Sequence, residues 1–333
     1  MDKGLKKIII SELKKRKYNG MAQYEMETLF NFSKSHISET LSEMISKNII
    51  IKKNCGKLIK KIWLKAYYPG HIENYIRIGI LKSSEYVKFL SAAFSVADSL
   101  NLNIQVISFN NTVDMMNAME NNALEISLSP AVSQIIYAIT KDNYFIIGPV
   151  ASGGSCIFSN DKFDSDQIKT SDISSMMLLS RNFMMLNKYN NISFYKNPKT
   201  GMLDFLKFKF RYIAIWEPFA SFIECKGRKR EKDYHDLLDD RPCCLISAGK
   251  EFYSKNNQIL ESIMNAYKSN ENIDGRAVKI ISRETSIDYD NVIKSIHRYN
   301  YSIKFDIDQL KDYANSMGIL LSEEKIKKIF KMM

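Results

Sequence analysis

The stretch that organises this chain runs from Ser33 to Lys65 and reads SKSHISETLSEMISKNIIIKKNCGKLIKKIWLK. Its first half repeats apolar side chains at the spacing of one helical face. The repeated residues are Ile37, Leu41, Met44 and Ile45. This spacing predicts a helix over residues 33–47 that packs its apolar stripe inward and presents small polar side chains outward.

Two short runs of β-prone residues follow, over residues 49–53 and 58–64. The residues between them, Asn54-Cys55-Gly56-Lys57, favour a tight turn because Asn and Gly readily adopt positive φ angles. The hairpin is basic throughout, and its lysines are Lys52, Lys53, Lys57, Lys60, Lys61 and Lys65. A helix with a small polar face followed by a basic hairpin is the pattern of a recognition helix and its wing.

Two further helices are predicted upstream of this stretch. The apolar positions of the first are Leu5, Ile8, Ile9 and Leu13, and those of the second are Met21, Met26, Leu29 and Phe30. The second helix turns into Ser33, a good N-cap for the third. This order of elements over residues 1–66 resembles the winged helix-turn-helix of MarR-like and related archaeal transcription factors. The alternative is a small three-helix interaction module with a solvated lysine face.

The distribution of charge favours DNA binding. Residues 1–66 contain 15 Lys and Arg and 6 Asp and Glu, a net charge of +9, whereas the whole chain carries +11. Positive charge concentrated in one segment is what binding to DNA phosphates requires. We expect contacts to base edges from Ser35, His36, Ser38 and Glu39, and contacts to phosphates from Lys34, Lys53 and Lys57. Double-stranded DNA is thus the expected partner, and an operator of two half-sites predicts a homodimer.

Length and composition define the rest of the chain. With 333 residues, 45% of them hydrophobic, the chain suits a small domain followed by a larger one of two lobes. It has no run of 18 apolar residues to span a membrane and no signal-peptide core, so we expect a cytoplasmic protein. The cysteines show no C-x-x-C pair, which argues against a disulfide framework and a zinc site, so no metal or cofactor is expected. They are Cys55, Cys156, Cys225, Cys243 and Cys244.

The pattern changes at Pro69-Gly70, where residues 67–74 form a polar linker. Beyond it, strands are predicted at 75–81, 104–109, 125–128, 144–150, 155–158, 176–179, 192–195, 212–215 and 243–247. Helices are predicted at 84–100, 112–121 and 130–140, from Asn182, from Thr200, and throughout the tail from Gln258. This alternation predicts an α/β fold of parallel β-α-β units, with ligand sites at the C-terminal ends of the strands.

Residues 75–331 resemble the type 2 periplasmic-binding-protein fold, in the branch that binds nitrate, sulfonates, taurine and thiamine-precursor pyrimidines. The most specific match is Ile215-Trp216-Glu217-Pro218-Phe219-Ala220-Ser221, which follows the Trp-Glu-Pro-aromatic-Ala-Ser signature of that branch almost letter for letter. The resemblance implies a two-lobed ligand-binding domain over residues 75–333. Lobe one would comprise residues 75–157 and 245–333, and lobe two residues 158–244. Alternatively, Trp216 and Pro218 simply cap a core strand.

The resemblance also implies a ligand site in the cleft between the lobes. Lobe one would contribute Lys82, Ser83, Asn110, Asn111 and Ser129. The crossover between the lobes would contribute open backbone amides at Ser152, Gly153 and Gly154. Lobe two would contribute Arg181, Asn182, Trp216 and Glu217. Helix N-termini in such a cleft favour polar or anionic groups. Arg181 would pair with a carboxylate or sulfonate. Trp216 would stack on a heteroaromatic ring such as an aminopyrimidine, and Glu217 would accept from its amino group. Alternatively, Arg181 and Glu217 pair with each other.

An enzymatic function is not expected. The same branch includes pyrimidine-forming enzymes that rely on a cysteine-rich iron motif and active histidines, whereas this chain has only the pair Cys243-Cys244. Its histidines, His36, His71, His235 and His297, are scattered along the sequence and predict no catalytic constellation. The acidic residues at 233–240 follow a run of Lys and Arg, which is better explained as a charged surface loop than as a metal site.

The expected function is a ligand-responsive, one-component transcriptional regulator. The family's transporters carry an export signal where this chain has its helix-turn-helix pattern, which argues against transport. LysR-type regulators offer an analogy of architecture, because they pair a helix-turn-helix with a similar two-lobed fold. The alternative is a cytoplasmic small-molecule-binding protein or an enzyme of thiamine-pyrimidine metabolism whose N-terminal module mediates assembly.

Overall fold

The computed structural model describes residues 3–55, 59–160, 166–269 and 272–333. The N-terminal unit contains α1 (Lys3–Arg16), η1 (Lys17–Asn19), β1 (Met21–Ala22), α2 (Gln23–Leu29), α3 (Lys34–Ser46), β2 (Ile50–Asn54) and β3 (Lys60–Leu64), and η2 (Lys65–Tyr67) follows it. Its strands form an antiparallel sheet in the order β1-β3-β2. The Ser33 hydroxyl accepts a hydrogen bond from the amide of His36 and so begins α3, as the sequence predicts.

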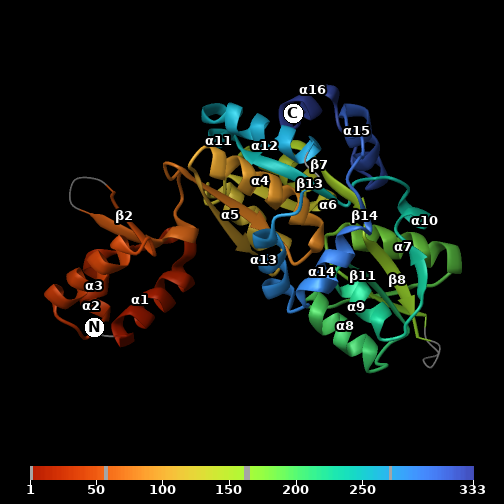
Figure 1. The fold of residues 1–333 in the computed structure, drawn as a ribbon, viewed down its shortest axis with the longest axis horizontal. Helices are drawn as coiled ribbons and strands as arrows, with labels where there is room; N and C mark the ends of the chain where they lie inside the picture. Colours follow the sequence, from red (N-terminus) through yellow and green to blue (C-terminus); the bar gives the residue numbers. More distant parts are fainter. Residues whose placement is uncertain (1–2, 56–58, 161–165, 270–271) are drawn as a thin grey trace.

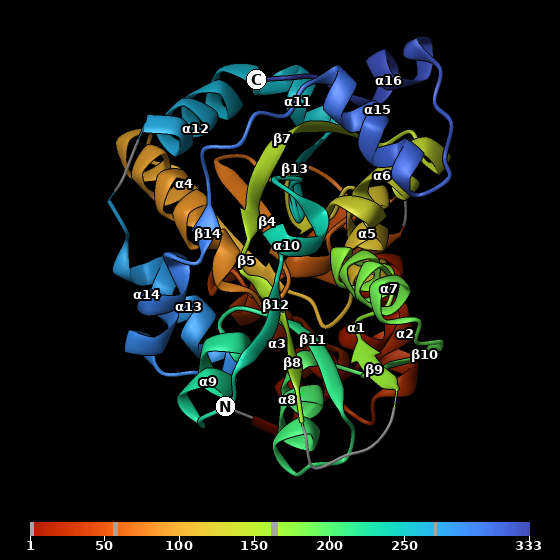
Figure 2. The ribbon, with the colours of Figure 1, turned by 90° about the vertical axis from the view of Figure 1, so that its right-hand side faces the viewer.

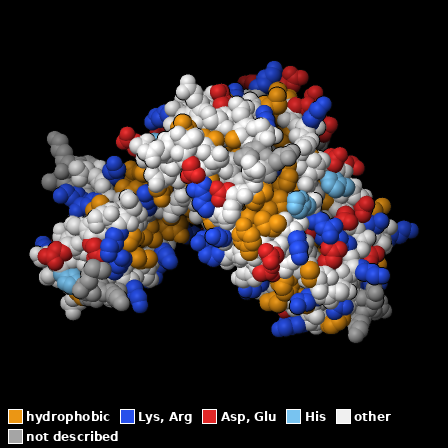
Figure 3. Space-filling model, viewed as in Figure 1, with side chains coloured by type: hydrophobic (Ala, Val, Ile, Leu, Met, Phe, Trp, Pro, Cys, Tyr) orange, Lys and Arg blue, Asp and Glu red, His pale blue; other side chains and the backbone are white. Residues whose placement is uncertain are grey.

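The N-terminal unit has a hydrophobic core of its own. Leu5, Ile9, Ile37 and Leu41 are buried in it, in a cluster separate from that of the larger body. Figure 1 shows the unit to one side of that body, and Figure 3 shows a notch between the two. The spacing of apolar residues in the sequence thus produces the expected packing between α1 and α3.

The larger body begins with β4 (Tyr75–Ile80), η3 (Ser84–Tyr86), α4 (Val87–Ser99), β5 (Asn103–Ser108), α5 (Thr112–Glu120), β6 (Ile126–Pro130), α6 (Ala131–Thr140) and β7 (Tyr144–Gly153). These strands belong to a six-stranded sheet in the order β14-β7-β13-β6-β4-β5. β4 pairs in parallel with β5 and β6, whereas β13 and β14 add antiparallel partners. Figure 2 shows α4 and α12 on one side of this sheet and α5 and α6 on the other.

A second sheet follows the crossover at Gly153-Gly154. Its segment contains β8 (Ser155–Ser159), β9 (Gln167–Thr170), α7 (Ser175–Asn187), β10 (Asn191–Phe194), α8 (Pro198–Leu206), β11 (Tyr212–Trp216), α9 (Phe219–Cys225), β12 (Arg230–Asp233) and α10 (His235–Leu238). The order of strands is β10-β9-β11-β8-β12. Two sheets joined by crossovers make the body the two-lobed α/β structure that the sequence predicts.

The chain then returns to the first sheet. The tail contains β13 (Cys244–Gly249), α11 (Lys250–Lys255), α12 (Asn257–Ser269), α13 (Gly275–Thr285), α14 (Tyr289–Ile296), β14 (Tyr299–Asn300), α15 (Ile307–Ser316) and α16 (Glu323–Ile329). The prediction of a tail that is helical throughout is wrong at β14 and at the segment after it, because β14 pairs with β7 at the crossover. Within the described residues, no helix has the length and apolar character needed to cross a membrane.

The prediction of a strand at residues 176–179 is also wrong. Residues 175–187 form one continuous helix, α7, and the place in the second sheet is taken by β9, which pairs in parallel with β10 and β11. A run of four apolar residues does not distinguish a strand from a turn of helix, and here the packing of the sheet decides. The predicted charged loop contains β12, which pairs with β8.

The connector between the two parts is held by a buried ion pair. Arg77 is fully buried on β4 and contacts Glu125 through Nη2 at 2.8 Å and through Nε at 3.0 Å. Its remaining N–H groups donate to the carbonyls of Tyr68 at 2.6 Å and Gly70 at 2.7 Å. We call Arg77 and Glu125 the connector clamp, because the pair ties residues 68–70 to the first sheet.

Candidate functional site

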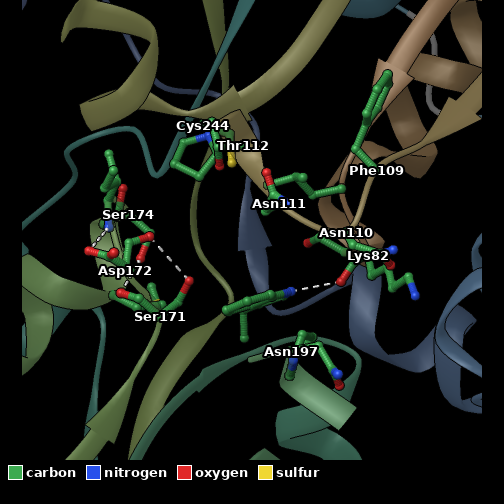
Figure 4. A pocket seen from close by; sticks show the side chains of 18 of the residues that line it. Lys82, Phe109, Asn110, Asn111, Thr112, Ser171, Asp172, Ser174, Asn197 and Cys244 are labelled. Atoms are coloured by element: carbon green, nitrogen blue, oxygen red, sulfur yellow. Dashed lines mark hydrogen bonds between the residues drawn. The ribbon is translucent and has the colours of Figure 1, made fainter. Parts of the chain in front are cut away.

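A cavity of about 190 Å³ lies between the two sheets. Its walls are the segments that follow β4, β5, β9 and β10, together with the ends of β6 and β11 and the start of β13. Figure 4 shows Lys82, Asn110 and Asn111 on one side and Ser171, Asp172 and Ser174 on the other. Ligands of open α/β sheets bind at the C-terminal ends of parallel strands, so this position is the expected one.

Trp216 connects the two walls. Its indole Nε1 donates to the carbonyl of Lys82 at 2.7 Å, and its ring centroid lies 6.2 Å from that of Tyr195. The bond to Lys82 uses the only polar atom of the indole, and the residue still lines the cavity together with Phe109 and Tyr195. The cavity therefore offers aromatic surface to a ligand.

Three helices begin at the cavity. Asn111 caps α5 by accepting from the amide of Asp114 at 2.8 Å, and Asn197 caps α8 by accepting from the amide of Thr200 at 2.9 Å. Ser174 precedes α7 and also lines the cavity. Helix N-termini carry partial positive charge, which favours polar or negatively charged groups of a ligand.

The floor of the cavity carries a buried carboxyl group beside two thiols. Glu85 is 2% exposed, and the Cys243 thiol donates to its Oε1 at 3.0 Å. Cys244 lies next in the chain, with its sulfur 3.3 Å from the hydroxyl of Tyr86. Burial raises the pKa of Glu85 to about 7, although the thiol hydrogen bonds oppose the shift. Burial also raises the pKa of Cys244 to about 11.

The structure brings some of the predicted ligand residues together. Lys82, Ser83, Asn110, Asn111 and Trp216 all line the cavity. Within this set, the amide of Asn111 is already engaged by Asp114, and the hydroxyl of Ser83 lies 3.0 Å from that of Tyr299. Lys82 and Asn110 are thus the members best placed to meet a ligand.

Four predicted residues lie outside the cavity lining, namely Ser129 of lobe one and Ser152, Gly153 and Gly154 of the crossover. Ser129 and Ser152 are fully buried inside strands, and their hydroxyls have no hydrogen-bond partner among the described residues. The prediction of open backbone amides is wrong at Gly154, whose N–H donates to the carbonyl of Arg298 at 3.0 Å. Gly153 and Gly154 have φ angles of +82° and +65°, so their role is to allow the turn between the sheets.

The structure does not bring Arg181 and Asn182 to the cavity, because both lie in the middle of α7 rather than after a strand. Arg181 is exposed, and Asn182 donates to the carbonyl of Leu237 at 2.8 Å. Glu217 is fully buried and pairs with Arg230 at 2.7 Å, not with Arg181 and not with the cavity. Arg181 is therefore not positioned to bind a carboxylate or sulfonate group of a ligand in the cavity.

Sequence reasoning missed several residues of the site. Ser171 and Asp172 follow β9, a strand that the sequence analysis does not predict. Lys196 follows β10, a strand that it does predict. The alternation of apolar and polar residues in Gln167-Ile168-Lys169-Thr170 is the signal that could have located β9. The pairing of Glu85 with Cys243 spans 158 residues, and no local pattern indicates it.

The residues predicted to contact DNA lie on α3 and the hairpin. Lys34, Ser35, Ser38 and Glu39 are exposed on α3, and His36 is half-buried with its ring 5.5 Å from that of Phe32. Lys34 lies 3.5 Å from Glu27 of the preceding helix.

On the hairpin, Lys53 is exposed on β2, and Lys57 lies outside the described residues. Lys65 does not belong to the exposed basic surface of the hairpin, because it is buried with its Nζ 3.4 Å from the centroid of the Tyr75 ring.

Comparison with protein-family models finds no match, and neither does comparison with curated protein sequences. Solved structures do match. A ligand-binding component of an ABC-type import system from Staphylococcus aureus, with zinc bound, has a TM-score of 0.61 at 15% identity, covering 77% of this chain and 98% of that one. The alkanesulfonate-binding protein SsuA from Xanthomonas axonopodis pv. citri, bound to MOPS, has a TM-score of 0.62 at 11% identity. The match covers 79% of this chain and 100% of that one.

The periplasmic nitrate-binding protein NrtA from Synechocystis PCC 6803 has a TM-score of 0.59 at 9% identity, covering 78% of this chain and 86% of that one. The covered share of this chain corresponds in length to the segment from Tyr75 to the C-terminus. At these identities the likeness concerns the fold, which is that of a two-lobed periplasmic binding protein.

Proposed function

We propose that this protein is a ligand-responsive, one-component transcriptional regulator. The observation that carries the proposal is the exposed polar face of α3 beside the lysine-bearing strands β2 and β3, in a segment that holds +9 of the chain's +11 charge. In this proposal residues 1–66 are a winged helix-turn-helix, residues 67–74 a linker, and residues 75–333 the sensor. The protein acts in the cytoplasm, where it has access to DNA.

The arrangement of α3 and the hairpin suggests how DNA would be read. The N-terminal half of α3 would enter the major groove with Ser35, His36, Ser38 and Glu39, while lysines of the hairpin would meet phosphates. Phosphate contacts set the affinity and its salt dependence, whereas base contacts set the sequence preference.

The experiment that tests DNA binding is a salt titration. Fluorescence anisotropy on promoter DNA would compare wild type with the double variant Lys53→Ala/Lys57→Ala. Loss of two phosphate contacts is expected to weaken binding on all sequences and to flatten the log–log salt slope by about 2. The control is Lys311→Ala/Lys327→Ala, which removes two charges from the far end of the chain. Equal affinity and slope in the wing variant and wild type would overturn the assignment.

The sensor would bind a small polar or anionic metabolite in the cavity. The helix N-termini and Lys82 favour a sulfonate or carboxylate group, and Trp216, Tyr195 and Phe109 favour a flat ring such as an aminopyrimidine. The structural neighbours include an alkanesulfonate-binding protein and a nitrate-binding protein, which supports binding rather than catalysis.

A contact between the two parts suggests a route for the signal. The Nζ of Lys17, directly after α1, lies 3.2 Å from Asp114, whose amide and carboxylate are both held by the cavity residue Asn111. A ligand that moved Asn111 would therefore act on a residue that contacts the N-terminal unit.

The second candidate function is a small-molecule-binding protein, or an enzyme of thiamine-pyrimidine metabolism, whose N-terminal unit only mediates assembly. The small-molecule-binding form of this function is favoured by the structural neighbours, which include a ligand-binding component of an import system and an alkanesulfonate-binding protein. Absence of salt-dependent DNA binding in the titration above, combined with a bound small molecule, would favour this second function.

A further inference from the structure

Three side chains able to bind a metal meet at the floor of the cavity. The carboxylate oxygens of Glu85 and the sulfurs of Cys243 and Cys244 offer ligand atoms that all lie within 4.8 Å of one another. Glu85 is 2% exposed and each cysteine is 5% exposed, yet all three line the cavity. Glu85 lies in η3, Cys244 begins β13 and Cys243 directly precedes it, so the fold alone brings them together.

The surroundings orient these groups toward one another. The Cys243 thiol points to Glu85 at 3.0 Å and lies 3.3 Å from the carbonyl of Ala151. The hydroxyl of Tyr86, 3.3 Å from the sulfur of Cys244, fixes the second thiol. Groups of this kind behind metal ligands hold them in position.

Burying these three polar groups costs free energy that packing in the core does not recover. A thiol is a weak donor, and a buried carboxyl group needs strong partners to offset its desolvation. Placement of a carboxyl and two thiols on the wall of a ligand cavity therefore indicates a role for them together.

We propose that Glu85, Cys243 and Cys244 bind a thiophilic divalent cation, with Zn(II) as the best match. Two thiolates and a carboxylate suit zinc, whereas Mg(II) and Ca(II) prefer six or more oxygen ligands. With Zn–S distances of about 2.3 Å and Zn–O distances of about 2.0 Å, tetrahedral ligand atoms lie roughly 3.5 Å apart. The Cys243 sulfur and the Glu85 oxygen, 3.0 Å apart, would separate slightly, and any pair near the upper limit of 4.8 Å would close by about 1 Å to reach that geometry.

Binding exchanges protons for the metal without any change of oxidation state. The two thiol protons, and the proton of the Glu85 carboxyl group where it is present, pass to solvent, and the metal holds the thiolates and the carboxylate. Two thiolates, a carboxylate and a divalent cation leave one negative charge, and two lysines that line the same cavity, Lys82 after β4 and Lys196 after β10, carry positive charge that partly offsets it. Three protein ligands leave a fourth position open to the cavity, where water or an anionic group of a small molecule would bind.

The test uses Co(II) as a spectroscopic probe on the reduced, chelator-treated full chain. Thiolate-to-cobalt charge-transfer absorption reports the number of thiolate ligands, and the intensity of the d–d bands reports four-coordinate geometry. We expect one equivalent of Co(II) with two thiolate ligands, displaced by one equivalent of Zn(II). The measurement needs no DNA, so its outcome is independent of the proposed regulatory function.

Variants locate the site. Cys244→Ser should halve the charge-transfer intensity and weaken Co(II) binding at least tenfold, and Glu85→Gln should weaken binding while keeping both thiolates. Cys55→Ser and Cys225→Ser, which change exposed thiols, are the matched controls and should leave the spectrum unchanged. Circular dichroism of each metal-free variant reports whether it folds.

Either of two results would overturn the proposal. One is a full charge-transfer band in folded Cys244→Ser, which would place the metal elsewhere. The other is a wild-type protein whose Co(II) spectrum contains no thiolate band, and this result holds even if the cysteine variants do not fold.

Discussion

Trp216 connects the two lobes at the cavity, since its N–H is bonded to the carbonyl of Lys82 and its side chain lines the space. We expect Trp216→Ala to abolish the thermal stabilisation caused by a bound sulfonate, carboxylate or aminopyrimidine, because it removes the stacking surface. Ligands found by thermal-shift screening on wild type would be tested on the variant. Arg181→Ala is the matched control, because Arg181 is exposed on α7. A ligand whose shift survives in Trp216→Ala would have to bind elsewhere.

Gly154 is a position in the crossover where the structure leaves no space for a side chain. A Cβ at this position would lie 1.9 Å from the ring of buried Tyr299, at a φ angle of +65°. We expect Gly154→Ala to cost about 2–4 kcal/mol, the sum of the left-handed backbone cost and the overpacking. Gly227→Ala is the control, because Gly227 has φ +78° but open space around its Cβ position, and it should cost only about 1 kcal/mol. Chemical denaturation of both variants would check this, and equal losses would contradict the clash.

At the scale of elements, the connector clamp ties η2 and the linker to β4. Burial alone would raise the pKa of Glu125, but the imidazole of His71, whose Nδ1 lies 3.7 Å from Oε1, and the hydrogen bonds and charge of Arg77 outweigh it and hold that pKa below its ordinary value. The folded state therefore favours the charged carboxylate. Its stabilising contribution is present above the ordinary value of 4.5 and is lost as the pH falls through the lower pKa of the folded state.

Glu125→Gln tests the clamp and its pH dependence. We expect the variant to lose about 3 kcal/mol near neutral pH, since buried Arg77 is left without its counter-charge. Below pH 4.5 the difference from wild type should shrink, because wild type loses the same interaction. Urea unfolding across this pH range measures both effects. The matched control is Glu73→Gln in the exposed part of the connector, and a constant difference at every pH would contradict the assignment.

At the scale of the whole molecule, the proposed function needs two copies of the N-terminal unit. One helix in one groove contacts few base pairs, so operators for such proteins consist of two half-sites and the proteins are symmetric dimers. We expect sedimentation velocity to show a homodimer at micromolar concentration. A monomer both with and without DNA would contradict this prediction.

The sequence by itself determined the local elements. Apolar spacing in Leu5, Ile9, Ile37 and Leu41, the N-cap at Ser33 and the alternation from Tyr75 onward predicted most of the helices and strands, because these signals act over a few neighbouring residues. The short strands β1, β9, β12 and β14 and the short helices α9 and α10 were not predicted. The two-lobed fold followed from the Trp216–Ser221 motif and the order of these elements. The order of elements also placed three residues at the cavity, because each directly follows or ends a correctly predicted strand. These residues are Lys82, Asn110 and Trp216.

Only the tertiary structure decided the rest. Residues 176–179 are helical, and β9 occupies the sheet position predicted for them, so Arg181 lies on the exposed face of α7. Glu217 pairs with Arg230, which is 13 residues away in the sequence. Glu85 meets Cys243 across 158 residues, and the amide of Gly154 is taken by the carbonyl of Arg298. Such pairings depend on which distant strands share a sheet, and a pattern read over a few residues contains no information about that choice.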